Sequence, residues 1–392
     1  MDFNLSIKQQ EIADSFRTFG ERVFTPEDVK RWCAGQGLPD EVVHEFADIY
    51  FGSCEYVDEF GIAHYDLVSK ALILEELSRC AGTTLPFQHD FFDLEIIERF
   101  ASDDTLRALL ANYRREGRLM FAVAISESDA GSDVMGIKTT ARTVDDRILL
   151  NGEKSYVFNG EYSPYVLVAA IDADDQTPSK YPHLSLWLVP SDTPGVRAYP
   201  IEKIGQAMVP FAAMKFINVE MKPEWRLSTR EVSFPALFKL LDTGRVFIAA
   251  SCLGMAQGAL EDAVAAAVKR RRFGQSVIDF QQIAQLVTDM EMRVRAMRSM
   301  LYKTAWEIDA GCDDSRLSSA LTKRFIPMTA TQVASDAMQV IGSEGYTEQS
   351  RVARIWRDCR GNQLAEGTDQ IMVKIAAPLI AGKYRNSKEK NG

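Results

Sequence analysis

The spacing of apolar residues changes twice along this 392-residue chain, and each change marks a switch in the expected secondary structure. From about residue 6 to 117, and again from about 234 onward, apolar residues recur at steps of three and four, as on one face of a helix. From about 119 to 221 they form short runs separated by polar, Pro and Gly segments, which predicts strands. The clearest helical stripe consists of Ile283, Leu286, Val287, Met290, Val294, Met297 and Leu301.

These three stretches predict an α+β protein that is mostly α. We place an N-terminal helical domain at residues 1–119 and a central small antiparallel β-barrel or sandwich at 120–228. A C-terminal four-helix bundle is expected at 229–385, followed by a polar, frayed tail at 386–392.

Local signals mark individual elements within these domains. A helix through residues 67–77 is expected to end at Ala81-Gly82, because glycine favours the left-handed backbone that follows a helix. Asn151-Gly152 lies between two apolar runs and predicts a hairpin turn, since both turn positions favour a positive φ. Further strands are predicted at 165–171, 184–189 and 214–221.

Charge and composition restrict the function classes. The formal net charge of −10 argues against a dedicated nucleic-acid binder, which would carry a basic face. No apolar run approaches the roughly 20 residues of a membrane-spanning helix, and the first residues do not resemble a signal peptide, so we expect a cytoplasmic protein. The six cysteines and four histidines are scattered, which argues against a metal site. Carboxylates or a bound cofactor should therefore supply the chemistry.

Five segments have compositions that suit a ligand site, and each also has a purely structural explanation. Residues 126–133 form a loop of small and hydroxyl residues, or an ordinary surface turn. The aromatic pair in 156–158 suits a ring cofactor, or simple sheet packing. The basic run 269–272 exceeds what a helix C-terminus needs and suggests an anionic partner. Segment 339–346 resembles a loop. Segment 366–370 resembles the cap at the start of a helix.

Taken together and in this order, the segments resemble the acyl-CoA dehydrogenase family. The first resembles the family's acidic Ala-Gly-Ser-Asp loop, and residues 150–160 resemble its Leu-Asn-Gly hairpin. The remaining matches are Arg270, Phe273, Gly274, Phe280 and Gln281, then residues 339–345, then Glu366, Gly367, Thr368 and Gln370.

The resemblance implies FAD bound between the sheet domain and the bundle, in a homotetramer built from dimers or in a dimer. It also implies which residues hold the cofactor: Ser126, Ser132, Tyr156, Phe158, Arg270, Phe273, Gln281, Gln339, Gly342, Thr368 and Gln370. Some of these, Arg270 among them, would reach FAD from across the dimer. The residues implied on the substrate side are Ser132, Asp242, Arg245 and Gly367.

For the reaction, the resemblance implies α,β-dehydrogenation of an acyl thioester. Glu366 would remove the α-proton and the β-hydrogen would pass as hydride to flavin N5, while hydrogen bonds to the thioester carbonyl stabilise the enolate. Burial would raise the pKa of the base towards working pH. The family's alternative position for the base is occupied by Gly244, which cannot serve.

Departures from the family pattern leave alternatives open. Phe158 stands where the family usually has a hydroxyl residue at flavin N5, Ser128 replaces a proline, and the Gly-rich segment near Gly61 is reduced. The resemblance extends to members that act on crotonobetainyl-type CoA esters and to members that act on acyl or aminoacyl groups of carrier proteins. Electrons could pass to an electron-transfer flavoprotein or, in an oxidase, to oxygen. A non-catalytic assembly subunit is the remaining alternative.

Overall fold

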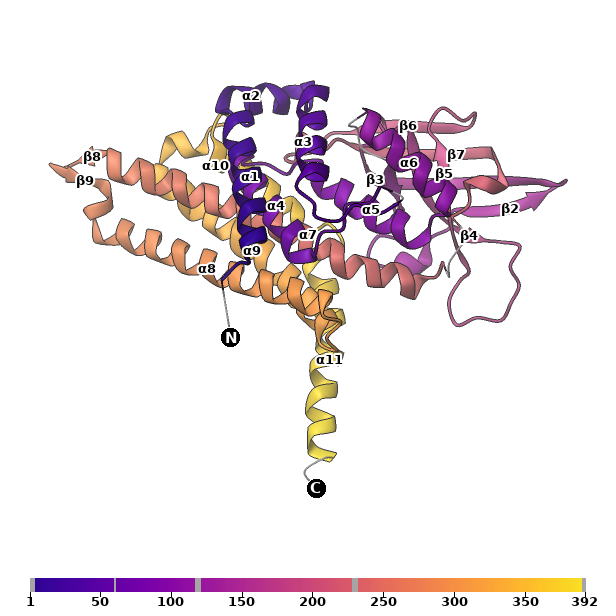
Figure 1. The fold of residues 1–392 in the computed structure, drawn as a ribbon. Helices are drawn as coiled ribbons and strands as arrows, with labels where there is room; N and C mark the ends of the chain where they lie inside the picture. Colours follow the sequence, from indigo (N-terminus) through magenta and orange to yellow (C-terminus); the bar gives the residue numbers. More distant parts are fainter. Residues whose placement is uncertain (1–3, 60, 117–120, 228–231, 390–392) are drawn as a thin grey trace.

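The computed structural model describes residues 4–59, 61–116, 121–227 and 232–389. Helices form both ends of the chain and a sheet forms its middle, as the spacing of apolar residues predicts (Figure 1). The N-terminal part contains α1 (Ile7–Val23), α2 (Pro26–Arg31), the π-helix Trp32–Gln36, α3 (Asp40–Gly52), α4 (Leu67–Ala81), α5 (Phe87–Phe100) and α6 (Asp103–Glu116). None of the helices in the described ranges is long and apolar enough to cross a membrane.

Local sequence explains how these helices begin and end. Ser6 and Gln9 form a reciprocal capping box at the start of α1, which satisfies backbone N–H groups that have no partner within the helix. The Asp66 side chain accepts a hydrogen bond from Ser69 N and so begins α4. Gly82, at φ +60°, ends α4 at the predicted place.

The central sheet contains β1 (Ala122–Ala124), β2 (Thr140–Val144), β3 (Arg147–Phe158), β4 (Tyr165–Asp172), β5 (Leu184–Pro190), β6 (Val196–Ile201) and β7 (Phe211–Met221). Its strand order is β1-β4-β2-β3-β7-β6, and β5 pairs with β4. Most pairings are antiparallel as predicted, but β4 runs parallel to both β1 and β2, so the sheet is mixed. The parallel pairings join residues that are far apart in the chain, so no local sequence pattern predicts them.

The predicted hairpin at Asn151-Gly152 is wrong, because β3 continues through these residues. The turn lies instead at Asp145 and Asp146, which have φ of +48° and +60° and connect β2 to β3. Asn151 and Gly152 lie at an irregularity in the pairing of β3 with β7. A Cβ at Gly152 would approach Thr139 Cα to 2.6 Å, so the glycine is there because the neighbouring backbone lies close.

The C-terminal part is a bundle of α7 (Phe234–Lys269), α8 (Gln281–Asp309) and α9 (Ser315–Ile341), joined by α10 (Arg351–Asn362) and α11 (Asp369–Glu389). Gly274 has the composition of a helix end, which would extend α7 to that position, but α7 ends at Lys269. Residues 271–276 instead form a small hairpin, β8 (Arg271–Arg272) and β9 (Gln275–Ser276). Helix α11 projects from the body and runs to Glu389, through most of the predicted tail (Figure 1).

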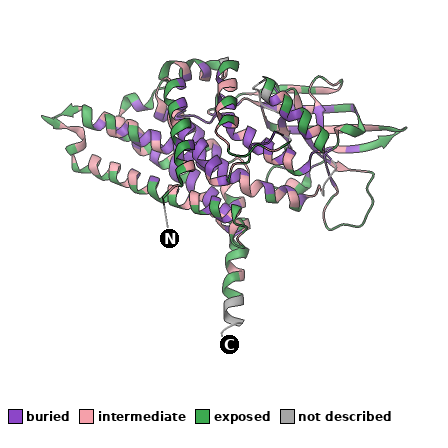
Figure 2. Cartoon of the chain, viewed as in Figure 1, coloured by how far each residue is buried: buried purple, intermediate pink, exposed green. Residues whose placement is uncertain are grey.

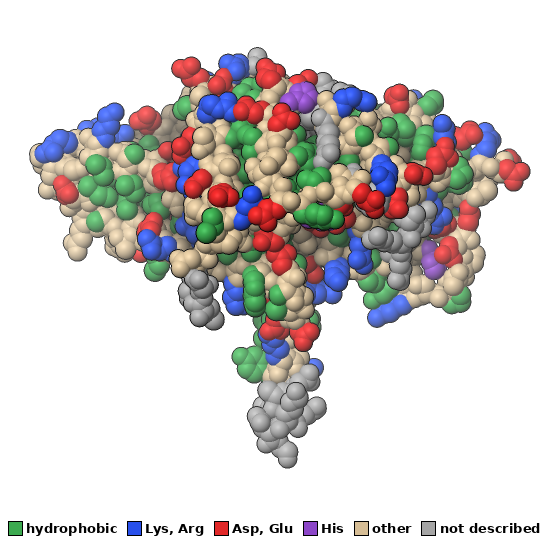
Figure 3. Space-filling model, viewed as in Figure 1, with side chains coloured by type: hydrophobic (Ala, Val, Ile, Leu, Met, Phe, Trp, Pro, Cys, Tyr) green, Lys and Arg blue, Asp and Glu red, His purple; other side chains and the backbone are tan. Residues whose placement is uncertain are grey.

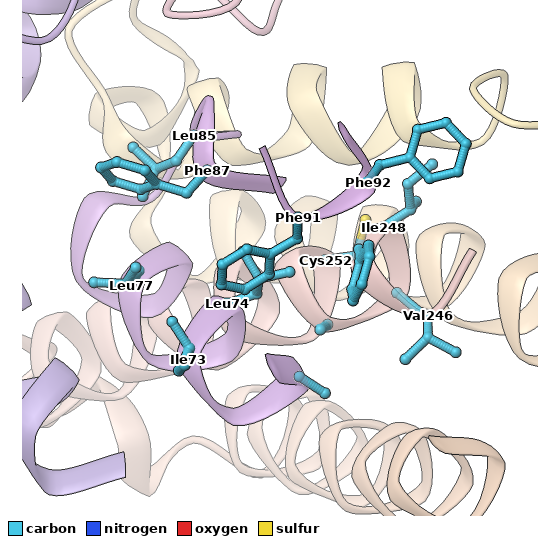
Figure 4. Close-up of a cluster of buried hydrophobic side chains, with 14 of the residues drawn as sticks. Ile73, Leu74, Leu77, Leu85, Phe87, Phe91, Phe92, Val246, Ile248 and Cys252 are labelled. Carbon is cyan, nitrogen blue, oxygen red and sulfur yellow. The ribbon is translucent and has the colours of Figure 1, made fainter. Parts of the chain in front are cut away.

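Helix α7 is the centre of the main core. Its middle, from Gly244 to Ala256, is buried on every side, and α4, α5, α8, α9 and α10 pack around it (Figure 2). Phe91 of α5 packs edge-on against Phe247 of α7, with ring centroids 5.7 Å apart. The same apolar cluster brings α4, α5 and α7 together (Figure 4). Acidic and basic side chains are interspersed over the face shown in Figure 3.

The buried carboxylate of Asp358 in α10 joins the sheet to the helical parts. It accepts hydrogen bonds from the Thr83 hydroxyl at 2.7 Å, Thr84 N at 2.8 Å and Gln206 N at 2.5 Å. The Gln206 side chain also donates to Asn362 Oδ1 at 2.8 Å. Because these donors come from the α4–α5 connection and the β6–β7 connection, Asp358 sets the position of the sheet relative to the bundle.

Candidate active site

A cavity of about 1140 Å³ lies where the N-terminal helices, the sheet and the bundle meet. Its lining includes three acidic side chains, Asp93, Asp133 and Glu366, and a larger set of cationic ones: Lys203, Arg245, Arg316, Arg357, Arg360 and Lys374. A cavity with more cationic than acidic side chains, in a chain with a net charge of −10, favours an anionic ligand.

Glu366 lies in the connection between α10 and α11, residues 363–368, which we call the base loop. Its φ is +49° and that of Gly367 is +99°, so two successive residues adopt the left-handed backbone that non-glycine residues rarely use. Burial raises the pKa of Glu366 to about 7, although the positive charges of Arg245 and Lys323 oppose the rise. Among the described residues, none forms a hydrogen bond with its buried Oε2.

Gly244 of α7 leaves the space in which this carboxylate lies. A Cβ added at Gly244 would overlap Oε2, and would lie 2.8 Å from Oε1. Glycine at position 244 has no side chain that could act as a base. Its missing Cβ also leaves the space that the carboxylate of Glu366 occupies.

Arg245 and Asp242 form an ion pair one turn apart on α7, with 2.5 Å between Nη1 and Oδ1. Arg245 Nε also donates to the backbone oxygen of Glu366 at 3.4 Å, so α7 contacts the base loop through Arg245. Arg245 lines the cavity, and Asp242 is not part of the lining. Burial lowers the pKa of Arg245, and the negative charge of Asp242 opposes that effect.

A buried ion pair supports the loop 126–133. Lys154 of β3 is fully buried, and its Nζ donates to Glu127 Oε1 at 2.9 Å and to Ile125 O at 2.8 Å. Glu127 also accepts hydrogen bonds from Thr139 N and Oγ1 at 2.9 and 2.6 Å and from Lys138 N at 2.7 Å. Burial alone would raise the pKa of Glu127, but these hydrogen bonds outweigh it and lower the pKa.

Aromatic residues of β3, Tyr156 and Phe158, form one wall of the cavity. The pairing of β3 with β7 shifts between Lys154 and Val157, and Tyr156 in this irregular segment has φ +59° and an exposed side chain. The Phe158 ring lies 4.1 Å from the His89 ring and 4.6 Å from the Phe211 ring, centroid to centroid. Burial lowers the pKa of His89 to about 4, so its imidazole is neutral at pH 7.

The structure divides most of the predicted site residues into two groups. The cavity is lined by Ser126, Ser132, Tyr156, Phe158, Arg245, Glu366, Gly367 and Thr368. Thr368 also begins α11, because its hydroxyl accepts from Ile371 N at 3.4 Å. Gln370 is exposed on the first turn of α11 and, like Asp242, is not part of the cavity lining.

The second group lies where α7, α8 and α9 meet the β8–β9 hairpin. It comprises Arg270, Phe273, Gln281, Gln339 and Gly342, which do not line the cavity. Arg270 Nη1 donates to Ile341 O at 2.5 Å, and Nη2 lies 3.3 Å from Glu344 Oε2. The Phe273 side chain is 96% exposed. A single chain therefore does not bring the two groups together, and their union across a dimer stays a prediction.

Several residues in and around the cavity were not among the predicted site residues. Glu127 and Lys154 lay inside segments that the sequence singled out, so their motifs carried a signal. His89, Arg316, Lys323 and Arg357 had no such signal, since each reaches the site only through tertiary packing.

All three parts of the chain match domains of one family. The acyl-CoA dehydrogenase N-terminal domain matches residues 6–115, the middle domain 122–219 and the C-terminal domain 234–380. The probable acyl-CoA dehydrogenase YdiO of Escherichia coli K12 is 32% identical over 387 residues, which cover 98% of this chain and 100% of that protein.

Solved structures give the same result. An acyl-CoA dehydrogenase from Slackia heliotrinireducens is 44% identical with a TM-score of 0.89, over 98% of this chain and 99% of that one. Butyryl-CoA dehydrogenase from Megasphaera elsdenii is 26% identical with a TM-score of 0.85, over 97% and 100% of the two chains. The chain belongs to the acyl-CoA dehydrogenase family, whose members are flavin oxidoreductases acting on CH–CH bonds.

Proposed function

We propose that this chain binds FAD in the cavity and catalyses α,β-dehydrogenation of an acyl-CoA thioester, with Glu366 as the base. The observation that carries the proposal is the Glu366 carboxylate, which lines the cavity with Oε2 unpaired among the described residues. Its pKa of about 7 suits proton abstraction near neutral pH, because a general base works best when its pKa is close to the working pH.

The residues of the cavity fit FAD. Tyr156 and Phe158 offer flat apolar surfaces for a ring system, and Ser126 and Ser132 offer hydroxyl groups. The cationic lining suits the phosphates of FAD and CoA. Bound FAD would supply the two-electron acceptor for the hydrogen that leaves the β-carbon.

To act as the base, Glu366 must meet two requirements, and the chain meets both. The carboxylate must be ionised to take the α-proton, and at a pKa of about 7 roughly half of the molecules hold it ionised at pH 7. It must also reach a bound acyl group, and the space beside Gly244 allows it to lie against α7 while facing the cavity. Arg245 keeps the loop backbone beside this position.

A CoA thioester is the proposed substrate, in preference to a carrier-protein thioester. Relatives with 26% and 27% identity are a butyryl-CoA dehydrogenase and a glutaryl-CoA dehydrogenase solved with glutaryl-CoA. We infer transfer of electrons to an electron-transfer flavoprotein, as the family resemblance implies. Rapid reoxidation by oxygen with release of peroxide would instead identify an oxidase.

The decisive test is an anaerobic absorbance titration of the purified, FAD-loaded protein with a panel of acyl-CoA esters. Bleaching of the oxidised flavin band by one ester is the expected result, and Glu366→Gln should abolish it while retaining FAD. Glu220→Gln changes an exposed carboxylate on β7 that pairs with Arg147, and it is the control that should bleach normally. A yellow protein bleached only by carrier-protein esters would replace the substrate assignment. A protein that cannot be loaded with FAD would favour a non-catalytic subunit.

A dimer or larger homo-oligomer is part of the proposal, because the group around Arg270 would reach FAD only in a neighbouring subunit. Analytical ultracentrifugation should show an assembled species in the presence of FAD. Phe273 lies at the tip of the β8–β9 hairpin and its side chain is 96% exposed. Phe273→Ala should reduce FAD retention only if this hairpin tip contacts a partner subunit.

A further inference from the structure

Lys323 of α9 is a fully buried lysine directly behind the base loop. Its Nζ donates to Gln363 O at 2.9 Å and to Gly367 O at 2.6 Å. These two carbonyls flank Glu366 on both sides. An ammonium group is costly to bury unless it is paired, and here backbone oxygens of one loop satisfy it. The arrangement therefore links one buried charge to the shape of one loop.

The base loop needs such support, because its backbone is unfavourable by itself. Left-handed backbone is unfavourable at Glu366, because its Cβ crowds the following carbonyl oxygen, whereas Gly367 adopts a positive φ without this penalty. Other hydrogen bonds each hold a single point of the loop or its flank: Arg245 donates to Glu366 O, and Gln363 Nε2 donates to Thr331 Oγ1 at 2.8 Å. Just beyond the loop, Arg324 Nη1 donates to Asp369 O at 3.0 Å. Lys323 binds both sides of the strained segment with a single group.

We propose that Lys323 is a positioning residue for the dehydrogenation: its ammonium group holds the base loop in the backbone conformation that presents the Glu366 carboxylate to the cavity. The inference rests on the proposed role of Glu366 as the base. It adds an electrostatic role, because the Lys323 charge favours the ionised form of the carboxylate and opposes the effect of burial on the pKa.

The charged and titratable groups around Lys323 come from three elements. Glu366 in the base loop and Asp369 at the start of α11 favour its protonated form, as does Cys252 of α7, while Arg245 of α7 opposes it. Burial is the largest effect and lowers the pKa of Lys323 to about 8, so the ammonium form prevails at pH 7. Arg245 and Lys323 are the cations that act on Glu366.

The test follows the carboxyl band of Glu366 by infrared difference spectroscopy during a pH titration of the FAD-loaded protein, with Glu366→Gln to assign the band. Lys323→Met removes the charge and the hydrogen bonds at similar length. We expect its Glu366 midpoint to rise by about one pH unit, since a nearby opposite charge lowers a carboxyl pKa by about 1–3 units. The acid limb of the kcat–pH profile should shift to higher pH with it, and kcat at pH 7 should fall about fivefold, because the ionised fraction falls from about a half to about a tenth.

Two further variants keep the test decisive if Lys323→Met does not fold. Lys323→Gln keeps a hydrogen-bond donor without the charge and should also raise the midpoint, whereas Lys323→Arg keeps the charge and should leave it near the wild-type value. Lys70→Met is the matched control, since Lys70 is a buried lysine that pairs with Glu95 away from the cavity. It should not change the midpoint.

An unchanged Glu366 midpoint in folded, FAD-loaded Lys323→Met or Lys323→Gln would overturn the inference. The infrared midpoint can be read even if no acyl-CoA is turned over, so failure of the proposed function is a separate result. A midpoint shift in the Lys70→Met control equal to that in Lys323→Met would equally overturn the assignment, because the effect would then be general.

Discussion

Replacing Glu366 by Gln should stabilise the protein, and the gain should depend on pH. The ordinary carboxyl pKa of 4.5 is raised to about 7 in the folded chain, so the folded state binds more protons than the unfolded state between these values. Wild-type stability therefore falls as pH rises through that window, and the full cost applies above pH 7. Glutamine has a similar shape and carries no charge at any of these pH values.

The size of the effect follows from the same values. A change in pKa from 4.5 to about 7 corresponds to about 3 kcal/mol, since a tenfold change in proton affinity is about 1.4 kcal/mol. The carboxylate faces a cavity that admits water, so we reduce this to about 2 kcal/mol. For a chain of this size, about 2 kcal/mol raises the melting temperature by roughly 2–4 °C.

The assay compares melting temperatures of wild type and Glu366→Gln at fixed protein and FAD concentrations from pH 4.5 to 8, because ligand binding shifts apparent stability. The two proteins should coincide near pH 4.5 and separate progressively up to pH 7. Glu127→Gln is the control of opposite sign, because the pKa of Glu127 is lowered and its ionised form stabilises the fold. A constant difference for Glu366→Gln across this range, or a lower melting temperature at pH 8, would refute the reasoning.

Further predictions concern the walls of the cavity. Gly244→Ala places a Cβ against the carboxylate of Glu366 and should lower kcat at least about tenfold with FAD content unchanged, as measured by turnover and flavin absorbance. Phe158→Thr restores a hydroxyl near the expected flavin and should change its redox potential in a spectroelectrochemical titration; an identical potential would contradict this. Lys154→Met leaves Glu127 without its buried cation and should cost about 3 kcal/mol and weaken FAD retention, measured by melting and by dialysis against FAD-free buffer.

The sequence by itself determined the order of helical, sheet and helical parts, because apolar spacing reports which face of each local element is buried. It also determined the end of α4 at Gly82, and the family motif around residue 366 singled out Glu366 as the candidate base. These features depend on residues a few positions apart, so they can be predicted without knowing the fold.

Tertiary structure alone decided the remaining features, because they depend on residues far apart in the chain. Asn151-Gly152 has the composition of a turn, but the backbone of Thr139 and the pairing with β7 keep it within a strand. The pKa of Glu366 depends on burial and on charges from α7 and α9. Lys323 is one lysine among many in the sequence, and only the packing of α9 behind the base loop places its charge beside Glu366.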